Sequence, residues 1–229
     1  MLGLGEAEWG AVALSLKVSF WATVLSLPLA LITAQALARG RFWGKSALNL
    51  AVHLPLLMPP VVTGYLLLVL FGTQGPLGRF FAIFGVEFAF RWTGAALAGA
   101  IMGFPLMVRA VRLALEAVDG RLEDAAGTLG ASRARVYLTI TLPLMAPGIA
   151  AGAILGFAKA MGEFGATITF VSNIPGQTQT VPTAIYTFLQ VPGQEGAALR
   201  LIVVSILLSA GALIASELLA ARMRKRLGR

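Results

Sequence analysis

The chain has 229 residues, 58% of them apolar and 12% charged, and it carries a net charge of +8. Because a soluble domain averages about 25% charged residues, the composition excludes an ordinary soluble protein and indicates a polytopic membrane protein. The sequence contains no cysteine, so disulfides and thiolate metal sites are excluded as well.

Five apolar segments are long enough for the roughly 20 residues that a helix needs to cross a bilayer. The first is too long for a cleaved signal peptide and has no small-residue cleavage site before Arg39. We therefore expect an all-α polytopic membrane protein with five transmembrane helices in one domain, residues 1–229. The predicted spans are residues 10–36, 47–72, 92–115, 144–171 and 198–221.

The basic residues predict how these helices are oriented. Thirteen of the 18 lysines and arginines fall in residues 39–45, 109–135 and 222–229, which five spans place on one side. By the positive-inside rule that side is the cytoplasm, so the N-terminus lies outside and the C-terminus inside. This topology accounts for the positive charge without nucleic acid, and the basic tail, which ends at Arg229, is expected to contact anionic membrane lipid.

The first span and the loop after it carry no predicted site. Ser15, Ser19 and Ser26 recur at helical spacing, which indicates hydrogen bonds between packed helices rather than a pathway lining. Lys17 lies near the outer end, where its side chain can reach the interface. Residues 39–46 imitate a phosphate-binding loop but have only three residues between the glycines, so no nucleotide binding is expected.

The second span is predicted to be broken. Pro55, Pro59 and Pro60 each remove a backbone donor, so a regular helix cannot run through them. Irregular backbone at membrane depth is tolerated where protein buries it or where it borders a water-filled cavity. The stretch, which continues into Thr63, is therefore either a structural kink or part of a translocation pathway. The single histidine, His53, is interpreted as a packing residue, and no metal site is expected.

Residues 73–91 form an outer loop with a short apolar run that predicts an interfacial helix.

In the third span Ala95, Gly99 and Gly103 recur at every fourth position, and such small residues let a second helix approach closely. The charges between residues 109 and 116, at the inner end of this span, are explained by a solvated helix terminus.

Residues 119–143 form the one sizeable polar segment between long apolar runs. Asp119 can cap a helix there, and Gly130 suits the left-handed residue that ends it. A helix this short is marginal alone in water, so its apolar stripe is expected to lie in a groove of this chain or of another one. The stripe consists of Leu122, Ala125, Ala126 and Leu129, at i, i+3, i+4 and i+7.

The fourth span combines small residues with two charges. Lys159 and Glu163 stand at i and i+4 and are interpreted as an ion pair, because unpaired charges at this depth cost at least about 2.5 kcal/mol each. Gly162 and Gly165 allow a bend at Phe164, which we hypothesise to be a gate. Small residues recur along this span and predict a tight interface with another helix, which could belong to a second copy of the chain. They are Gly148, Gly152, Gly156 and Ala160.

Residues 172–197 are polar and punctuated by proline and glycine, and the apolar run 181–191 is too short to span. This run fits a re-entrant or interfacial piece on the outer face. A sixth crossing there stays open and would reverse the side of one terminus.

The residues assigned to the hypothetical translocation pathway and gate are Pro59, Pro60, Thr63, Glu163, Phe164, Gly165 and Thr167.

One pattern in residues 119–143 resembles the EAA loop of the membrane subunits of ATP-binding-cassette (ABC) importers. Asp124-Ala125-Ala126 is followed by Gly130 and later by Ile140-Thr141-Leu142-Pro143. Asp124 departs from the usual glutamate, although Glu123 precedes it. In this family the loop is a coupling helix that lies in a cleft of a cytoplasmic ATPase subunit. The resemblance therefore implies that the ATPase-coupling residues are Glu123, Asp124, Ala125, Ala126, Leu129, Gly130, Ile140, Leu142 and Pro143.

Further stretches, among them residues 59–62, 64–69, 104–110 and 162–176, resemble the permeases of bacterial molybdate ABC importers. The resemblance implies a type I importer fold, a homodimer of permeases in the inner membrane, two ATPase subunits and an external oxyanion-binding protein. It also implies no catalytic residue and no cofactor on this chain, with ATP and Mg²⁺ on the ATPase subunits. Related permeases for tungstate and for sulfate or thiosulfate share parts of these motifs, so those cargoes stay open.

Two other functional classes are weighed against an importer subunit. An ion-coupled secondary transporter needs ionisable groups within the membrane, and only Lys17, Lys159 and Glu163 qualify. A membrane-embedded enzyme needs a catalytic constellation, which one histidine, no cysteine and few carboxylates do not supply. Both classes are therefore disfavoured.

Overall fold

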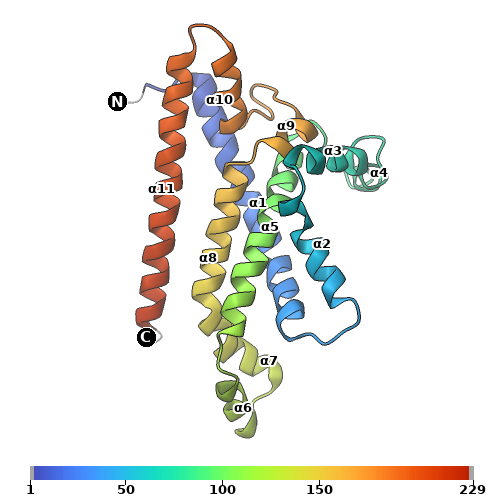
Figure 1. Ribbon diagram of the computed structural model, residues 1–229, viewed down its shortest axis with the longest axis vertical. Helices are drawn as coiled ribbons and strands as arrows, with labels where there is room; N and C mark the ends of the chain where they lie inside the picture. Colours follow the sequence, from blue (N-terminus) through green and yellow to red (C-terminus); the bar gives the residue numbers. More distant parts are fainter. Residues whose placement is uncertain (1–2, 227–229) are drawn as a thin grey trace.

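The structure, a computed structural model, describes residues 3–226, and the regular elements in that range are all helical. Long helices make up most of the bundle, and shorter helices lie at its two ends and along one side (Figure 1). The elements are α1 (Glu6–Arg39), α2 (Lys45–Leu57), α3 (Pro60–Phe71), α4 (Pro76–Ala82), α5 (Trp92–Glu116), α6 (Gly120–Thr128), α7 (Arg133–Val136), the π-helix η1 (Tyr137–Thr141), α8 (Leu142–Met161), α9 (Gly165–Val171), α10 (Val181–Gln190) and α11 (Glu195–Arg226).

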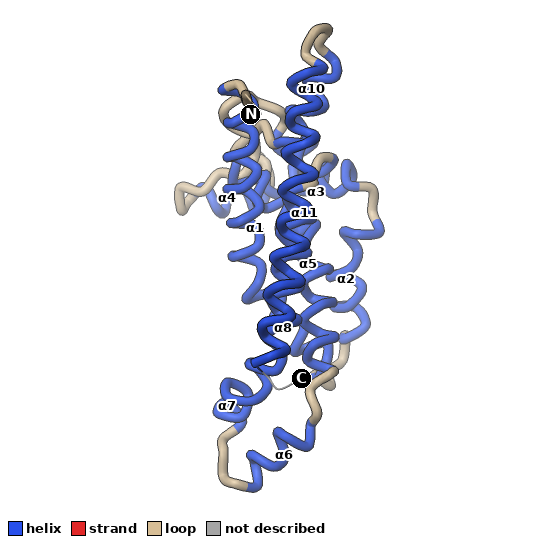
Figure 2. Tube along the Cα trace, turned by 90° about the vertical axis from the view of Figure 1, so that its left-hand side faces the viewer, coloured by secondary structure: helices blue, strands red, loops and turns tan. Residues whose placement is uncertain are grey.

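Helix α5 forms the centre of the bundle. It packs along both α1 and α8, and α2 and α9 also contact it. Helix α11 runs beside α8 (Figure 1, Figure 2). The start of α1 lies at one end of the bundle, whereas α6, α7 and the end of α11 lie at the other. The polar segment and the C-terminal helix end are therefore on the same side, opposite the N-terminal helix start.

Small residues let α5 and α8 approach each other closely. A Cβ added to Gly103 would lie 2.9 Å from the carbonyl oxygen of Gly156, and one added to Gly148 would lie 2.2 Å from the Cβ of Ala114. The close approach predicted for the third span is confirmed. The small residues of the fourth span pack against α5 of the same chain, so the alternative that a second copy occupies this stripe is wrong.

The number of helices able to cross a membrane agrees with the prediction. Four helices in the described residues are long and apolar enough: Glu6–Arg39, Trp92–Glu116, Arg133–Met161 and Glu195–Ala215. Helices α2 and α3 count as a fifth if their 114° bend is treated as one broken span. The break predicted from the prolines is confirmed, because Met58 and Pro59 separate the two helices. Helix α10 has 10 residues and is not among the candidate spans found in residues 3–226, so the sixth crossing is not supported.

The fourth span was predicted at residues 144–171, and both limits are wrong. The helical path begins at Arg133, continues through η1 and ends at Met161. Its first turns are polar, so hydropathy alone does not detect them. Residues 162–164 then interrupt the helix, and α9 follows as a separate element. The predicted bend beside Phe164 is therefore a complete break.

The end of the bundle where α1 begins is held together by polar contacts. The backbone N–H of Val181, the first residue of α10, donates to Oγ of Ser15 on α1 at 2.7 Å. Nε of Arg200 on α11 donates to Oε1 of Glu8 on α1 at 2.9 Å, and Glu8 is buried. Ser15, Ser19 and Ser26 are all buried. Ser26 Oγ lies 3.5 Å from Sδ of Met107 on α5, whereas the Ser19 hydroxyl has no hydrogen-bond partner in the described residues. The predicted bonds between helices are therefore confirmed for Ser15 and Ser26 only.

Candidate functional site

Helix α6 begins and ends as the sequence predicts. The carboxylate of Asp119 accepts the backbone N–H of Arg121 at 3.0 Å, which caps the start of the helix. Gly130 has a φ of +85°, the left-handed conformation that suits glycine after a helix end. Ser132 then caps α7 through the N–H of Arg135. Local chemistry thus separates α6 from the helices on either side of it.

The apolar stripe of α6 is uncovered. No residue of the helix is buried, Leu122 is 46% exposed and Leu129, directly after the helix, is 89% exposed. Ala125 is exposed and Ala126 is half-buried. Helix α6 lies at the tip of the bundle (Figure 1), and the exposure of its stripe shows that no groove in residues 3–226 receives it. Of the two partners left open by the sequence, a groove of this chain is excluded.

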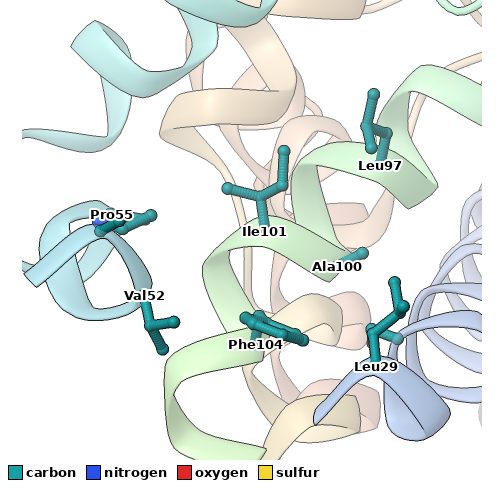
Figure 3. Close-up of a pocket in the computed structure, with 9 residues that line it drawn as sticks. Leu29, Val52, Pro55, Leu97, Ala100, Ile101 and Phe104 are labelled. Carbon is teal, nitrogen blue, oxygen red and sulfur yellow. The ribbon is translucent and has the colours of Figure 1, made fainter. Parts of the chain in front are cut away.

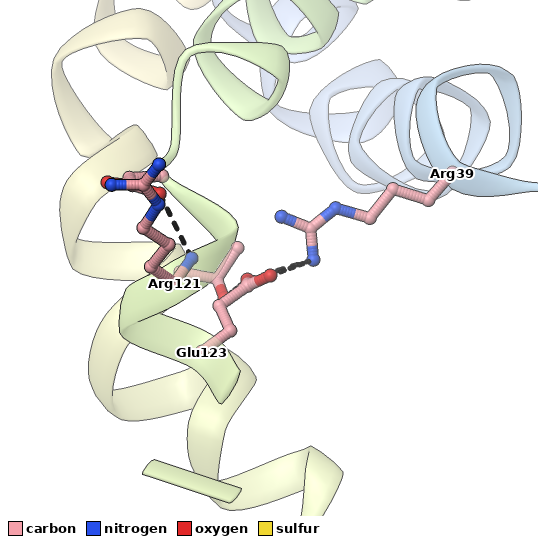
Figure 4. Close-up of polar contacts among 5 residues, drawn as sticks. Arg39, Arg121 and Glu123 are labelled. Carbon is pink, nitrogen blue, oxygen red and sulfur yellow. Dashed lines mark hydrogen bonds and ion pairs between the residues drawn. The ribbon is translucent and has the colours of Figure 1, made fainter. Parts of the chain in front are cut away.

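Glu123 ties α6 to two other elements. Nη1 of Arg39, at the end of α1, lies 2.8 Å from the Glu123 carboxylate, and the two side chains point toward each other (Figure 4). The hydroxyl of Thr141, at the end of η1, also donates to this carboxylate. Burial by itself raises the pKa of the Glu123 carboxyl, but the hydrogen bonds from Thr141 and Arg39 outweigh it, so the net pKa is lowered.

The remaining residues of the EAA-like motif run from α6 to the start of α8. Asp124 is exposed on α6 and, with Arg133 and Tyr137, lines a polar pocket of about 770 Å³. Ile140 belongs to η1, and Leu142 and Pro143 are the first residues of α8. The motif therefore spans a tip helix, a π-helix and the base of a long helix.

The two stretches assigned to the pathway come together in space. Helix α3, which follows the first break, packs against α9, which follows the second. A Cβ added to Gly64 would lie 2.5 Å from the carbonyl oxygen of Ala166, and one added to Gly165 would lie 2.8 Å from the Cβ of Pro60. The packing of α9 on α3 thus brings together the segments that directly follow the two breaks.

Glu163 has a structural role in this junction. It is 3% exposed; its Oε2 lies 2.8 Å from Nζ of Lys159, and its Oε1 accepts the N–H of Ala166 at 2.9 Å. The ion pair predicted from sequence is confirmed. The same carboxylate joins the end of α8 to the start of α9, so it is engaged by this chain on both oxygens.

The other residues of the hypothetical pathway differ in exposure. Thr63 and Thr167 are buried, and the Thr63 hydroxyl has no hydrogen-bond partner in the described residues. Pro59 and Pro60 are exposed at the start of α3. The ring of Phe164 lies 5.2 Å from that of Tyr186, centroid to centroid, so Phe164 contacts α10.

An apolar pocket of about 410 Å³ lies between α1, α2 and α5 (Figure 3). Leu29, Val52, Pro55, Leu97, Ala100, Ile101 and Phe104 surround it. Its only hydroxyl comes from Ser26, which donates to the backbone carbonyl of Ala22. A pocket without a charge or a free donor is unsuited to an anion.

Two residues that the sequence left without a role have partners in the structure. Nζ of Lys17 lies 3.8 Å from the ring centroid of Trp92, a cation–π contact between α1 and α5. His53 lines a small pocket with arginines of α5, which the packing interpretation missed. The i, i+4 spacing of Asn49 and His53 on α2 is the signal that could have indicated a shared face. The described residues contain no cluster of metal-ligating side chains.

Comparison with known proteins relates the chain to membrane transport. The family described as "Binding-protein-dependent transport system inner membrane component" matches residues 26–225. The molybdenum transport system permease protein ModB of Escherichia coli K12 is 57% identical over 227 residues, which cover 99% of each chain. ModB of Haemophilus influenzae is 54% identical over 222 residues, covering 96% of this chain and 97% of that one. The sulfate transport system permease protein CysT of Salmonella typhimurium is 35% identical over 79% of this chain and 65% of its own.

Solved structures share the fold. A bacterial ABC transporter involved in the import of the acidic polysaccharide alginate has a chain with a TM-score of 0.72 and 19% identity, covering 100% of this chain and 82% of that one. The methionine ABC transporter MetNI, in inward-facing conformations, has a TM-score of 0.68 and 14% identity, with 95% and 94% coverage. The expected all-α importer-type fold is confirmed.

Proposed function

The chain belongs to the family of binding-protein-dependent transport system inner membrane components, and we propose that it is the permease subunit of a molybdate importer. The observation that carries this proposal is the 57% identity to ModB of Escherichia coli, which extends over 99% of both chains. The weaker and shorter match to a sulfate permease supports a tetrahedral oxyanion as the general class of cargo.

In the proposed transporter the chain forms a homodimer in the inner membrane and binds no cofactor itself. ATP and Mg²⁺ bind to two separate cytoplasmic ATPase subunits, and an external binding protein delivers the anion. The exposed stripe of Leu122 and Leu129 supports an ATPase partner, because uncovered apolar side chains at the polar tip of a membrane protein mark a protein contact. The N-terminus faces outside and α6 faces the cytoplasm.

A continuous set of contacts connects the tip to the proposed pathway. A displacement of α6 acts through Glu123 on Arg39 of α1 and on Thr141, directly before α8. At the far end of α8 the Lys159–Glu163 pair leads to α9, and α9 packs against α3. Alternating access requires elements that move as rigid bodies around breaks. The interruptions after Leu57 and Met161 are suited to be such hinges.

Selectivity is assigned mainly to the external binding protein. The α3–α9 junction offers Thr63, Thr167 and the neutralised Glu163, and none of these supplies a free positive charge to hold a dianion. The junction is therefore proposed as a path and a gate rather than a storage site. The gate hypothesis centres on Phe164.

Uptake measurements test the proposed function. Cells that lack this gene are expected to regain uptake of radiolabelled molybdate when the chain is expressed with its own ATPase and binding-protein genes. Unlabelled tungstate should compete with molybdate, and sulfate should compete weakly. If sulfate competed as well as molybdate, the cargo assignment would be wrong, and if no oxyanion were taken up, the permease proposal would fail.

Purification separates the importer from the two other classes. The chain should co-purify with an ATPase subunit and hydrolyse no ATP by itself. Oxyanion transport by the chain alone, driven by an ion gradient, would instead establish a secondary transporter.

A further inference from the structure

A second polar pocket lies between α2 and α5, outside the α3–α9 junction and outside the α6 network. It has a volume of about 270 Å³. Asn49 and His53 line it from α2, and Arg109, Arg112 and Glu116 line it from α5. The residues of α5 are in its last turns, which lead to α6, so the pocket is at the end of the bundle that carries the polar tip.

The positive charges of this pocket exceed its negative charges. Nε of Arg112 lies 2.8 Å from Oε1 of Glu116, so these two groups neutralise each other. The guanidinium of Arg109 makes no hydrogen bond and no ion pair to another residue of the described range 3–226. One full positive charge is therefore available in a pocket that Asn49 also lines.

His53 adds a donor that depends on its protonation. Its Nδ1 lies 2.9 Å from the backbone carbonyl oxygen of Asn49, and since a carbonyl only accepts, Nδ1 carries the hydrogen. In the neutral ring Nε2 then has no hydrogen to donate. Only the protonated ring offers Nε2–H together with a charge. The other charged groups that line the pocket are Arg109, Arg112 and Glu116.

We propose that Asn49, His53 and Arg109 form a binding site for a tetrahedral oxyanion at the inner end of the chain. A guanidinium presents planar paired donors that match two oxygens of such an anion, and the amide and imidazolium can donate to the others. The site takes either a free dianion or the phosphate group of an anionic lipid. If the orientation under the proposed function holds, a free dianion bound here is leaving the pathway toward the cytoplasm.

Binding to the purified full-length chain in nanodiscs tests the site. Molybdate and sulfate are titrated in nanodiscs of pure phosphatidylcholine, and retention of phosphatidylglycerol is measured in mixed nanodiscs. Arg109→Gln should weaken one of the two interactions by about tenfold or more, as expected for a charged hydrogen bond. Arg79→Gln, which removes the same charge from α4, is the control and should leave both unchanged. Loss of molybdate and sulfate binding identifies a free dianion, and loss of phosphatidylglycerol identifies a lipid phosphate.

A pH series provides a second readout that a folding defect does not imitate. The unsubstituted chain should bind the anion more tightly at about pH 6 than at about pH 8, because only a doubly protonated ring can donate from Nε2 while Nδ1 donates to the Asn49 carbonyl. His53→Gln should remove that dependence while the thermal unfolding temperature stays the same. Equal binding by Arg109→Gln and Arg79→Gln would overturn the site. If molybdate uptake is intact but Arg109→Gln and Arg79→Gln bind equally well, the site is rejected and the transport function stands. If uptake fails but Arg109→Gln clearly weakens binding, the transport function is rejected and the site stands.

Discussion

Glu123 is the residue through which the polar tip is attached to the bundle. It accepts from Arg39 and from Thr141, so one carboxylate connects three elements. An ion pair that is partly exposed contributes little, typically below about 1 kcal/mol, and the Arg39 side chain is 37% exposed. The importance of the Glu123–Arg39 pair therefore lies in the position in which it holds α6 rather than in the stability that it adds.

We expect Glu123→Gln to lower the free energy of unfolding by about 0.5 to 1 kcal/mol, because the amide keeps a hydrogen-bond acceptor but loses the charge. Glu116→Gln, which breaks the exposed pair with Arg112, is a matched control with a smaller effect. Thermal unfolding in detergent measures both. A larger effect of Glu116→Gln would contradict a special role for Glu123.

The lowered pKa of Glu123 gives the contact a pH dependence. A carboxyl whose pKa is depressed by folding contributes its full stabilisation above the unfolded value, about 4.3, and loses it as the pH falls through the folded value. The unfolding temperature should therefore decrease on acidification below about pH 5 by a larger amount in the parent chain than in Glu123→Gln. Parallel curves for the two chains would show that other groups dominate.

Phe164 belongs to the break between α8 and α9, and its ring contacts Tyr186 of α10. If this aromatic pair closes the pathway, Phe164→Ala should uncouple the transporter. The assembled complex would then hydrolyse ATP faster without delivering more molybdate. ATPase activity and uptake measured on the same reconstituted sample test this. Unchanged coupling would remove Phe164 as a gate and leave it as a packing residue.

Helix α6 should gain stability when its uncovered stripe finds a partner, because a helix of nine residues is marginal by itself in water. Leu129 is 89% exposed, so a substitution there leaves the fold of this chain intact. Leu129→Glu should weaken the ATPase contact by about 10-fold or more, since burying a leucine contributes about 1.5 to 3 kcal/mol. Co-purification and molybdate-dependent ATP hydrolysis report the change.

Thr128→Glu is the control for this substitution. Thr128 is exposed on the same helix but off the stripe, so the added charge stays in solvent. If both variants lost the ATPase subunit equally, charge at the tip rather than the apolar stripe would determine docking.

Helices α5 and α8 are held at close range by residues without side chains. Gly103 faces the backbone of Gly156, which has no flexible group that could move away. Gly103→Leu should therefore destabilise the chain by about 1 to 3 kcal/mol through overpacking. Gly211→Leu on α11, where no atom beyond the adjoining residues and backbone of its own helix lies within 4 Å of an added Cβ, should change stability by less than about 0.5 kcal/mol. Thermal unfolding of the two variants distinguishes a tight interface from a general intolerance of leucine.

The whole molecule places its N-terminal helix start and its polar tip at opposite ends, which makes the orientation testable. The chain has no cysteine, so single cysteines can be introduced without a background signal. Gln194→Cys, in the exposed turn between α10 and α11, should react with a membrane-impermeant maleimide on intact spheroplasts. Arg121→Cys on α6 should react only after permeabilisation. The opposite pattern would reverse the predicted topology and place the tip beyond the reach of a cytoplasmic ATPase.

Much of the fold was predictable because it depends on local properties. The spans follow from apolar length, the break between α2 and α3 from three prolines, and the ends of α6 from Asp119 and Gly130. Each of these is decided within a few residues by backbone geometry or by hydropathy. The limits of the fourth span were mispredicted because its first turns are polar and its last residues belong to another helix.

What the sequence determined by itself is that this chain crosses a membrane about five times and carries a short amphipathic helix at one end. Only the tertiary structure decided which residues meet. It brought Glu123 to Arg39 and His53 to Arg109, and it turned the small face of α8 toward α5. Contacts between residues far apart in the chain depend on how the helices pack. The spacing of residues along a helix defines which residues share a face, but it does not determine which other helix packs against that face.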